Sequence, residues 1–162
     1  MKGMNNKIIE RANLATSIAD WKKDRAKIVF TNGCFDILHL GHIDYLSKAA
    51  SFGDVLIIGL NTDESVKKLK GNGRPINDEN SRAQILGALE FVDGVVLFNE
   101  ETPISLIEAI TPDILTKGGD YDAEDVVGYD HVITSGGEVR IIKFLPGYST
   151  SSIIQKILNL NE

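Results

Sequence analysis

The sequence has a single cysteine, no long apolar run and no excess of basic residues. Cys34 alone cannot form an internal disulfide. The 17 Lys and Arg against 23 Asp and Glu give a formal net charge of -6, so nonspecific binding to nucleic acid or an anionic membrane has no electrostatic support. No basic-then-apolar leader opens the chain. We therefore expect a cytoplasmic protein that binds neither nucleic acid nor membrane.

At 162 residues the chain has the length of one domain with a real core. Its first part, residues 5–23, places apolar side chains on one face at helical spacing: Ile8, Ala12, Ala15, Ile18 and Ala19. This spacing predicts a leading amphipathic helix in residues 1–26, ahead of a main domain at 27–162. The helix is expected to pack on that domain or on a partner subunit.

After Lys27, short β-rich runs alternate with helical stretches. Strands are expected at 28–30, 55–60, 95–98, 113–115 and 139–144, and helices at 41–51, 63–69, 78–90, 103–110 and 150–160. This alternation predicts an α/β fold, a Rossmann-like open parallel sheet with helices on both faces. The glycine-rich segments 70–77 and 117–122 interrupt the pattern and are expected to be surface loops that contact substrate.

The segment TNGCFDILHLGH, at 31–42, follows the first expected strand and opens the first expected helix. Open parallel sheets bind phosphate at this position. It has no GxGxxG pattern, which disfavours a dinucleotide oxidoreductase. Instead, His39 and His42 lie on one face of the helix start, and Gly41 between them permits close approach of a triphosphate. Two such donors suit charge stabilisation at a phosphorus atom, with no protein nucleophile.

Two other interpretations of the histidines stay open. They are either satisfied structural residues or, with Cys34, part of a zinc site. Zinc is disfavoured because no second cysteine accompanies Cys34 and a fourth ligand is missing. Cys34 itself is expected to be a small side chain that packs within the fold.

The same motif resembles the signature of the cytidylyltransferase-like nucleotidyltransferase superfamily. Further segments resemble the adenylyltransferase domain of bacterial ADP-heptose synthases, in order from about residue 27 to 157: SVKKLKGNGRP at 65–75, the surroundings of Arg82, LTKGGDY at 115–121 and PGYSTSSII at 146–154. The resemblance implies transfer of AMP from ATP to D-glycero-β-D-manno-heptose 1-phosphate, with release of pyrophosphate, for lipopolysaccharide core or surface-glycan synthesis.

The resemblance also implies roles for individual residues. His39, His42, Lys70 and Arg82 are expected to be catalytic, and Lys68 and Arg74 to bind the substrate phosphate. The nucleotide is expected to contact Asn32, Gly33, Cys34, Phe35, Asp36, Gly41, Lys117, Gly118, Gly119, Asp120, Ser149, Thr150 and Ser151. Plainer interpretations are a solvated lysine cluster, a surface salt bridge at Arg82, a turn at 117–120 and simple N-capping by Ser149.

Two departures from the wider superfamily bear on the substrate. Some cytidylyltransferases have an arginine before the closing serine-threonine motif, where this chain has Phe144 and Leu145, and a lysine late in the first helix, where it has Ala50. Phe144 favours the heptose branch over glycerol-3-phosphate cytidylyltransferase, which remains the main alternative. A nucleotide-binding regulatory module is the nonenzymatic alternative.

The resemblance implies partners as well. Mg²⁺ is expected to arrive bound to ATP rather than in a metal site of the protein. The kinase that makes the sugar 1-phosphate is expected to be a separate protein. A homodimer or larger homo-oligomer is expected, with the leading helix contributing an apolar face.

Overall fold

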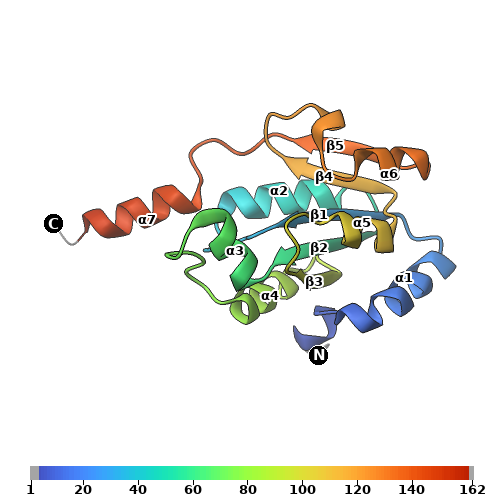
Figure 1. Cartoon of the computed structure of the whole chain (residues 1–162), viewed down its shortest axis with the longest axis horizontal. Helices are drawn as coiled ribbons and strands as arrows, with labels where there is room; N and C mark the ends of the chain where they lie inside the picture. The colour runs from blue at the N-terminus through green and yellow to red at the C-terminus, as the bar shows by residue number, and fades with distance from the viewer. Residues whose placement is uncertain (1–3, 161–162) are drawn as a thin grey trace.

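The computed structural model describes residues 4–160 and contains a five-stranded parallel sheet in the order β3-β2-β1-β4-β5 (Figure 1). The strands are β1 Ile28–Gly33, β2 Val55–Asn61, β3 Gly94–Phe98, β4 Ile114–Gly118 and β5 Glu138–Ile142. The helices are α1 Leu14–Lys23, α2 Leu40–Ala50, α3 Asp63–Lys70, α4 Glu79–Gly87, α5 Ile104–Ile110, α6 Tyr129–Thr134 and α7 Thr150–Asn159. Short 3-10 turns lie at η1 Met4–Lys7, η2 Arg11–Asn13 and η3 Ala123–Asp125.

Both faces of the sheet are covered, which confirms the expected architecture. In β1, Val29 belongs to an apolar cluster with side chains of α2 and α4. Its neighbours Ile28 and Phe30 belong to a second cluster with side chains of α1, α5 and α6. Successive side chains of a strand point to opposite faces, so a strand buried on both faces is apolar throughout. That is why the runs at 28–30 and 55–60 lack polar alternation, whereas the edge strand β5 has the charged Glu138 and Arg140 among its apolar residues.

The strand order reverses between β1 and β4. The chain runs outward from β1 through β2 to β3, then returns to the other side of β1 with β4 and β5. β1 and β4 are parallel neighbours, with Phe30 opposite Leu115. In open α/β sheets, ligands bind outside the carboxyl ends of the strands at such a reversal. The residues after Asn32 in β1 and Thr116 in β4 therefore lie where a ligand is expected.

The leading segment differs from the single helix expected at 5–23. Ile8 forms a parallel bridge with Val95 of β3, and the Ile9 N–H donates to the Val95 carbonyl at 2.8 Å. Helix α1 begins only at Leu14, and it buries Leu14 and Ile18 against the core rather than the alanine stripe. Of the two expected alternatives, packing on the main domain or on a partner subunit, Leu14 and Ile18 show the first, while Ala12, Ala15 and Ala19 stay exposed.

Two helices differ in how firmly they join the core. α6 was not expected from the sequence, because it has six residues and buries only Val132. α7 buries none of its side chains and extends away from the sheet (Figure 1). It leaves Ile157 and Leu158 more than half exposed.

Among residues 4–160, no helix is both long and apolar enough to cross a membrane.

Candidate active site

The two histidines of the motif are stacked at the start of α2. His39 is the N-cap residue, in extended conformation, and makes no side-chain capping bond. The imidazole centroids of His39 and His42 are 3.8 Å apart, with 21° between the planes. Both Nδ1 atoms are buried and have no hydrogen-bond partner within the described chain. Buried polar atoms are rarely left so, and an unpaired pair in one place indicates a ligand site.

The same surroundings keep both rings neutral. Burial lowers the pKa of His42 to about 4, with further lowering from His39 and Lys70 and a smaller opposing effect of Asp36. Burial also lowers the pKa of His39. A neutral imidazole still carries one N–H donor, which can be given to a phosphate oxygen. A bound anion would in turn favour protonation of the rings.

Gly41 is required by close packing at this helix start. A Cβ at this position would lie 3.1 Å from the His39 ring and 3.0 Å from Tyr148 Cβ. The missing side chain therefore gives space to His39 and to the segment before α7. Close approach of a triphosphate to Gly41 stays a prediction.

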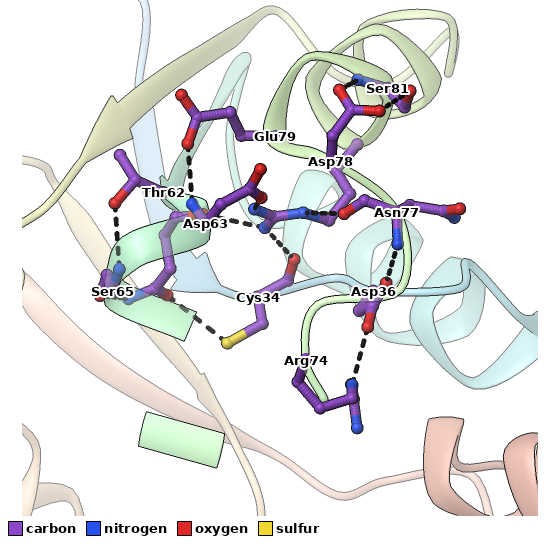
Figure 2. Close-up of polar contacts among 12 residues, drawn as sticks. Cys34, Asp36, Thr62, Asp63, Ser65, Arg74, Asn77, Asp78, Glu79 and Ser81 are labelled. Atoms are coloured by element: carbon purple, nitrogen blue, oxygen red, sulfur yellow. Dashed lines mark hydrogen bonds and ion pairs between the residues drawn. The ribbon is translucent and has the colours of Figure 1, made fainter. Parts of the chain in front are cut away.

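Asp36 lies under the loop that follows α3 (Figure 2). Its buried carboxylate accepts from Arg74 Nε at 2.8 Å, the Ile76 N–H at 2.8 Å and the Asn77 N–H at 2.9 Å. Burial raises its pKa, but the hydrogen bonds from Asn77, Ile76 and Arg74 outweigh burial and the pKa is lowered. Its backbone carbonyl accepts from the Thr150 hydroxyl at 2.7 Å. Asp36 thus fixes the 71–77 loop and the start of α7, and its carboxylate is turned to protein donors rather than to a nucleotide.

Arg82 also differs from its expected role. Its side chain is buried, and Nη1 donates to the carbonyls of Cys34 at 2.7 Å and Asn61 at 2.8 Å. Nε donates to the Asn77 carbonyl at 3.0 Å, and Nη2 pairs with Asp63 Oδ1 at 2.7 Å. A guanidinium used in this way joins the ends of β1 and β2 to the start of α4. It is not free to fork onto an acceptor phosphate, so the structure gives Arg82 a positioning role.

The three basic residues after β2 are not equivalent. Lys68 forms an exposed ion pair with Glu64 on α3 at 2.6 Å. This contact favours the plainer interpretation of Lys68 as a solvated surface residue over substrate binding. Arg74 donates from Nε to Asp36, and within residues 4–160 its two terminal nitrogens have no hydrogen-bond partner. Lys70, the last residue of α3, is exposed and acts electrostatically on both His42 and Cys34. Lys70 and Arg74 therefore remain candidates for phosphate binding.

The residues between β1 and α2 form a tight loop. Phe35 and Ile37 have positive φ values of 46° and 49°, a conformation that is uncommon for non-glycine residues and is enriched at active sites. The Phe35 ring lies where a Cβ of Gly33 would be, at 2.9 Å, and meets the His42 ring edge-on at 5.4 Å. Through Phe35, this loop packs against the ring of His42.

Cys34 is a partly buried thiol within this loop. Its Sγ is 3.9 Å from Asn61 Oδ1. Burial raises its pKa, despite the lowering effects of Lys70, Arg82 and Arg74, so the group stays protonated. In the described part of the chain, no three or more His, Cys, Asp or Glu side chains are grouped to hold a metal ion. The zinc interpretation therefore has no ligand set.

The KGGD loop at 117–120 follows β4, and its glycines accommodate aromatic rings. A Cβ at Gly118 would lie 2.4 Å from the Phe144 ring, and one at Gly119 would lie 2.5 Å from the Tyr121 ring. Gly119 also has a φ of +135°, which favours glycine. Asp120 is exposed. The resemblance assigned these residues to base or ribose contact, and that role stays a prediction.

The start of α7 combines a helix cap with free amides. Ser149 is the N-cap, and its hydroxyl accepts from the Ser152 N–H at 3.0 Å. The expected N-cap is therefore confirmed. The Thr150 hydroxyl is used by Asp36, while Ser151 is exposed. The first backbone amides of α7 and the Ser151 hydroxyl remain for an anion.

Sequence reasoning missed a polar cluster beneath the site. Thr31 and Thr116, on the adjacent strands β1 and β4, both bond the hydroxyl of Tyr45, at 2.6 Å and 3.3 Å. All three side chains are buried. A threonine within otherwise apolar strands was the available signal. The cluster ties α2, which carries His42, to the two central strands.

Comparisons with known proteins identify the family of the chain. A family model described as Cytidylyltransferase-like matches residues 30–156. The bifunctional protein HldE of Citrifermentans bemidjiense is 53% identical over 158 residues, 98% of this chain and 32% of the relative. HldE of Aliarcobacter butzleri is 59% identical over 131 residues, 81% of this chain and 27% of the relative. The chain spans about a third of the length of the curated relatives it matches.

Solved structures show the same fold. The lipopolysaccharide core biosynthesis protein from Thermoplasma volcanium is similar with a TM-score of 0.59 and 32% identity, over 74% of this chain and 97% of that one. Pantoate-beta-alanine ligase from Francisella tularensis has a TM-score of 0.58 at 17% identity, over 96% and 79% of the two chains, which shows the fold alone. On the family match and the sequence identities, the chain belongs to the cytidylyltransferase-like family of nucleotidyltransferases.

Proposed function

We propose that the protein transfers AMP from ATP to D-glycero-β-D-manno-heptose 1-phosphate and releases pyrophosphate. The observation that carries the proposal is the pair of stacked, neutral histidines whose buried Nδ1 atoms have no partner in the described part of the chain. They lie at a helix start, where Lys70 acts electrostatically on His42 and Tyr148, before α7, lies close to Gly41. Such a helix start with imidazole donors and a nearby lysine suits phosphate oxygens. HldE relatives at about half identity and the resemblance to ADP-heptose synthases support the sugar.

The geometry supports direct transfer between phosphates. An oxygen of the acceptor phosphate would attack the α-phosphorus of ATP, and the bond to the bridging oxygen of the β-phosphate would break. His39 and His42 would donate hydrogen bonds to the oxygens on which negative charge develops, and Lys70 would add a positive charge. Cys34 is a protonated thiol and therefore a weak nucleophile. The proposal accordingly includes no covalent enzyme intermediate.

The donor set of the site suits a metal ion that arrives with the nucleotide. Its candidate groups are imidazoles, a lysine and backbone amides, while the carboxylate of Asp36 is occupied by protein donors. Mg²⁺ would share the neutralisation of the triphosphate and of the leaving pyrophosphate. Activity should therefore be lost in excess chelator and restored by added Mg²⁺.

We also propose the remaining partners. A separate sugar kinase would supply the heptose 1-phosphate, and the reaction would take place in the cytoplasm, where ATP is abundant. A homodimer is still our expectation, but its apolar surface would come from α7, since that of α1 is used internally. Light scattering at micromolar concentration tests this, and a monomeric mass would refute it.

The test of the reaction is an assay of pyrophosphate release. Purified protein is incubated with each nucleoside triphosphate, Mg²⁺ and a panel of acceptors that includes heptose 1-phosphate and glycerol 3-phosphate. ATP with heptose 1-phosphate should give the highest kcat/KM. A clear preference for CTP and glycerol 3-phosphate would overturn the heptose assignment.

A further inference from the structure

A tyrosine hydroxyl lies inside the apolar layer between α2 and the sheet. Tyr45 is 5% exposed and belongs to the same apolar cluster as Leu46 and Ala49 of α2. A phenylalanine would fill this space without the cost of withdrawing a hydroxyl from water. The hydroxyl has two partners, the side chains of Thr31 on β1 at 2.6 Å and Thr116 on β4 at 3.3 Å. What it adds to burial is a pair of bonds from the helix to the two central strands.

The two threonines do not depend on the tyrosine for a partner. Each hydroxyl can donate to a backbone carbonyl: Thr31 to that of Thr116 at 3.3 Å, and Thr116 to that of Phe30 at 3.4 Å. The two strands are also paired directly. Removal of the Tyr45 hydroxyl would therefore leave both threonine donors with an acceptor, and the loss of stability should be small. What is removed is the fixed orientation of α2.

The bonds of Tyr45 give α2 a directional contact with the sheet. Within residues 4–160, the other side-chain hydrogen bonds of α2 stay inside the helix or at its C-cap: Lys48 with Asp44, and Ser51 with the Lys48 carbonyl. The remaining packing of α2 on the strands is apolar, and the hydrophobic effect is non-directional. A hydrogen bond requires alignment. Tyr45 therefore sets the rotation of α2 about its own axis.

His42 is the side chain that this rotation would move. It precedes Tyr45 on α2 by one turn and lies on the same side of the helix. Its ring centroid is 3.8 Å from that of His39 and 5.4 Å from that of Phe35. Rotation of α2 would displace the His42 ring, whose buried Nδ1 has no partner among the described residues. Misplacement of a reacting group by about 1 Å can cost on the order of 100-fold in rate.

The ring of Tyr45 also reaches the carboxyl end of β4. A Cβ at Gly118 would lie 3.1 Å from Tyr45 Cε2 and 2.4 Å from Phe144 Cε1. The centroids of the two rings are 6.3 Å apart. One side chain thus joins the helix of His42 to the edge of the sheet at which open α/β folds bind ligands. The position of the histidine is fixed relative to that edge.

We propose that Tyr45 is a positioning residue: its hydroxyl, held by Thr31 and Thr116, fixes the rotation of α2 and so aims the His42 ring at the reacting phosphate. The inference rests on the proposed function and adds to it a residue that contacts neither substrate. Tyr45 acts through the helix that it shares with His42.

The first test removes the hydroxyl and keeps the ring. Tyr45→Phe should lower kcat about tenfold or more, and it should change the KM for ATP and for heptose 1-phosphate less than about twofold. The urea midpoint of unfolding should fall by no more than about 0.5 M. Tyr129→Phe, on α6, is the matched control and should change none of these values. An unchanged kcat in Tyr45→Phe, whatever its stability, would overturn the proposal.

The second test asks whether the tyrosine acts through its partner on β1. Thr31→Val alone should lower kcat about threefold or more, because it removes the shorter of the two bonds. In the Tyr45→Phe background the same substitution should lower kcat less than about twofold further, since that bond is already gone. Equal factors in the two backgrounds would show that the side chains act independently, and would overturn the proposal.

A third measurement needs no activity and distinguishes this inference from the proposed function. The chemical shifts of the His42 ring depend on its position beside the rings of His39 and Phe35. In NMR spectra of the free protein with carbon-13-labelled histidine, Tyr45→Phe should move the His42 ring peak by more than its line width and leave that of His131 in place.

The two failures then give different results. If wild-type protein releases no pyrophosphate from ATP and any acceptor, the proposed function fails, and the NMR measurement still decides whether Tyr45 positions His42. A displaced His42 peak in Tyr45→Phe supports the positioning role. A His42 peak that does not move overturns it, even in a protein whose transferase activity is established.

Discussion

Two groups of charged and polar side chains flank Cys34, and they differ in whether the protein itself satisfies them. On one side, both carboxylate oxygens of Asp36 accept hydrogen bonds from the protein, and most N–H groups of Arg82 donate to it. Their partners are mainly backbone groups. On the other side, among residues 4–160, the buried Nδ1 atoms of His39 and His42 have no partner and no carboxylate pairs with Lys117. The first group, Asp36 and Arg82, fixes the loops around the site. The second group, the two histidines and Lys117, has polar atoms that are available to a ligand.

This difference separates stability from activity. A side chain whose partners are all within the protein contributes to folding, and its removal leaves those partners buried and unpaired. A side chain without partners costs folding energy and is retained for what it binds. Substitutions in the two groups should therefore affect different measurements.

The largest expected effect is the loss of stability on removing Arg82. Arg82→Met leaves the carbonyls of Cys34, Asn61 and Asn77 and the carboxylate of Asp63 without their donor. We expect the free energy of unfolding, measured in urea, to fall by about 3–5 kcal/mol. Arg11→Met is the matched control, because Arg11 pairs with Glu100 at 3.0 Å on the surface, and it should cost no more than about 1 kcal/mol. Equal losses would place Arg82 outside the satisfied group.

The opposite result is expected for the histidines. His39→Ala and His42→Ala should each lower turnover by about two orders of magnitude or more, because each removes a donor to the reacting phosphates. The free energy of unfolding should fall much less than in Arg82→Met, since ring packing is removed but neither Nδ1 has a partner to lose among the described residues. The control is His131→Ala. His131 lies on α6, where its Nε2 is 3.2 Å from the Thr111 hydroxyl, and its removal should leave turnover unchanged. Near-normal turnover in both variants would reject the assignment.

Asp36→Asn should have a smaller effect on stability. The two carboxylate oxygens accept three N–H groups, and an amide replaces one oxygen with a donor that faces other donors. We expect a loss of about 1–3 kcal/mol at neutral pH. The pKa of Asp36 is lowered in the fold, so its contribution is present above its ordinary pKa and is lost as pH falls through the folded value. The difference between wild type and variant should therefore shrink in acid, and a constant difference would contradict the charged-acceptor argument.

The sequence predicted the fold well because the central strands are short, continuous apolar runs separated by helical stretches. The run at 55–60 became β2, Val55–Asn61, and the expected helix at 63–69 became α3, Asp63–Lys70. The leading helix was predicted to begin too early, at residue 5 rather than Leu14, because pairing of Ile8 with Val95 depends on a strand far along the chain. Helical spacing cannot reveal such a contact.

The site was predicted as a set of positions without their partners. Motif resemblance placed Arg82 and His42 in the same catalytic group, yet the structure buries one among four hydrogen bonds and leaves the other unpaired. The resemblance selects residues near a ligand but does not state whether each one contacts the ligand or the protein. That distinction requires the distances between segments far apart in sequence, such as Asp36 and the 74–77 loop.

The smallest expected effect is proton uptake when ATP binds, and it tests the unsatisfied group directly. In the free protein the pKa of His42 is about 4, so the ring is neutral at pH 6. A triphosphate beside the ring favours the charged form and raises that pKa. The complex then holds more protons than the free protein between the two pKa values, so ATP affinity should increase as pH falls from about 7 to 5, by less than about 1.4 kcal/mol per pH unit. Calorimetry in two buffers of different ionisation enthalpy measures the uptake, and His42→Asn corrects for protonation of ATP itself. Equal uptake by wild type and variant would show that the triphosphate does not lie against His42, and would move the reacting phosphates away from the histidine pair.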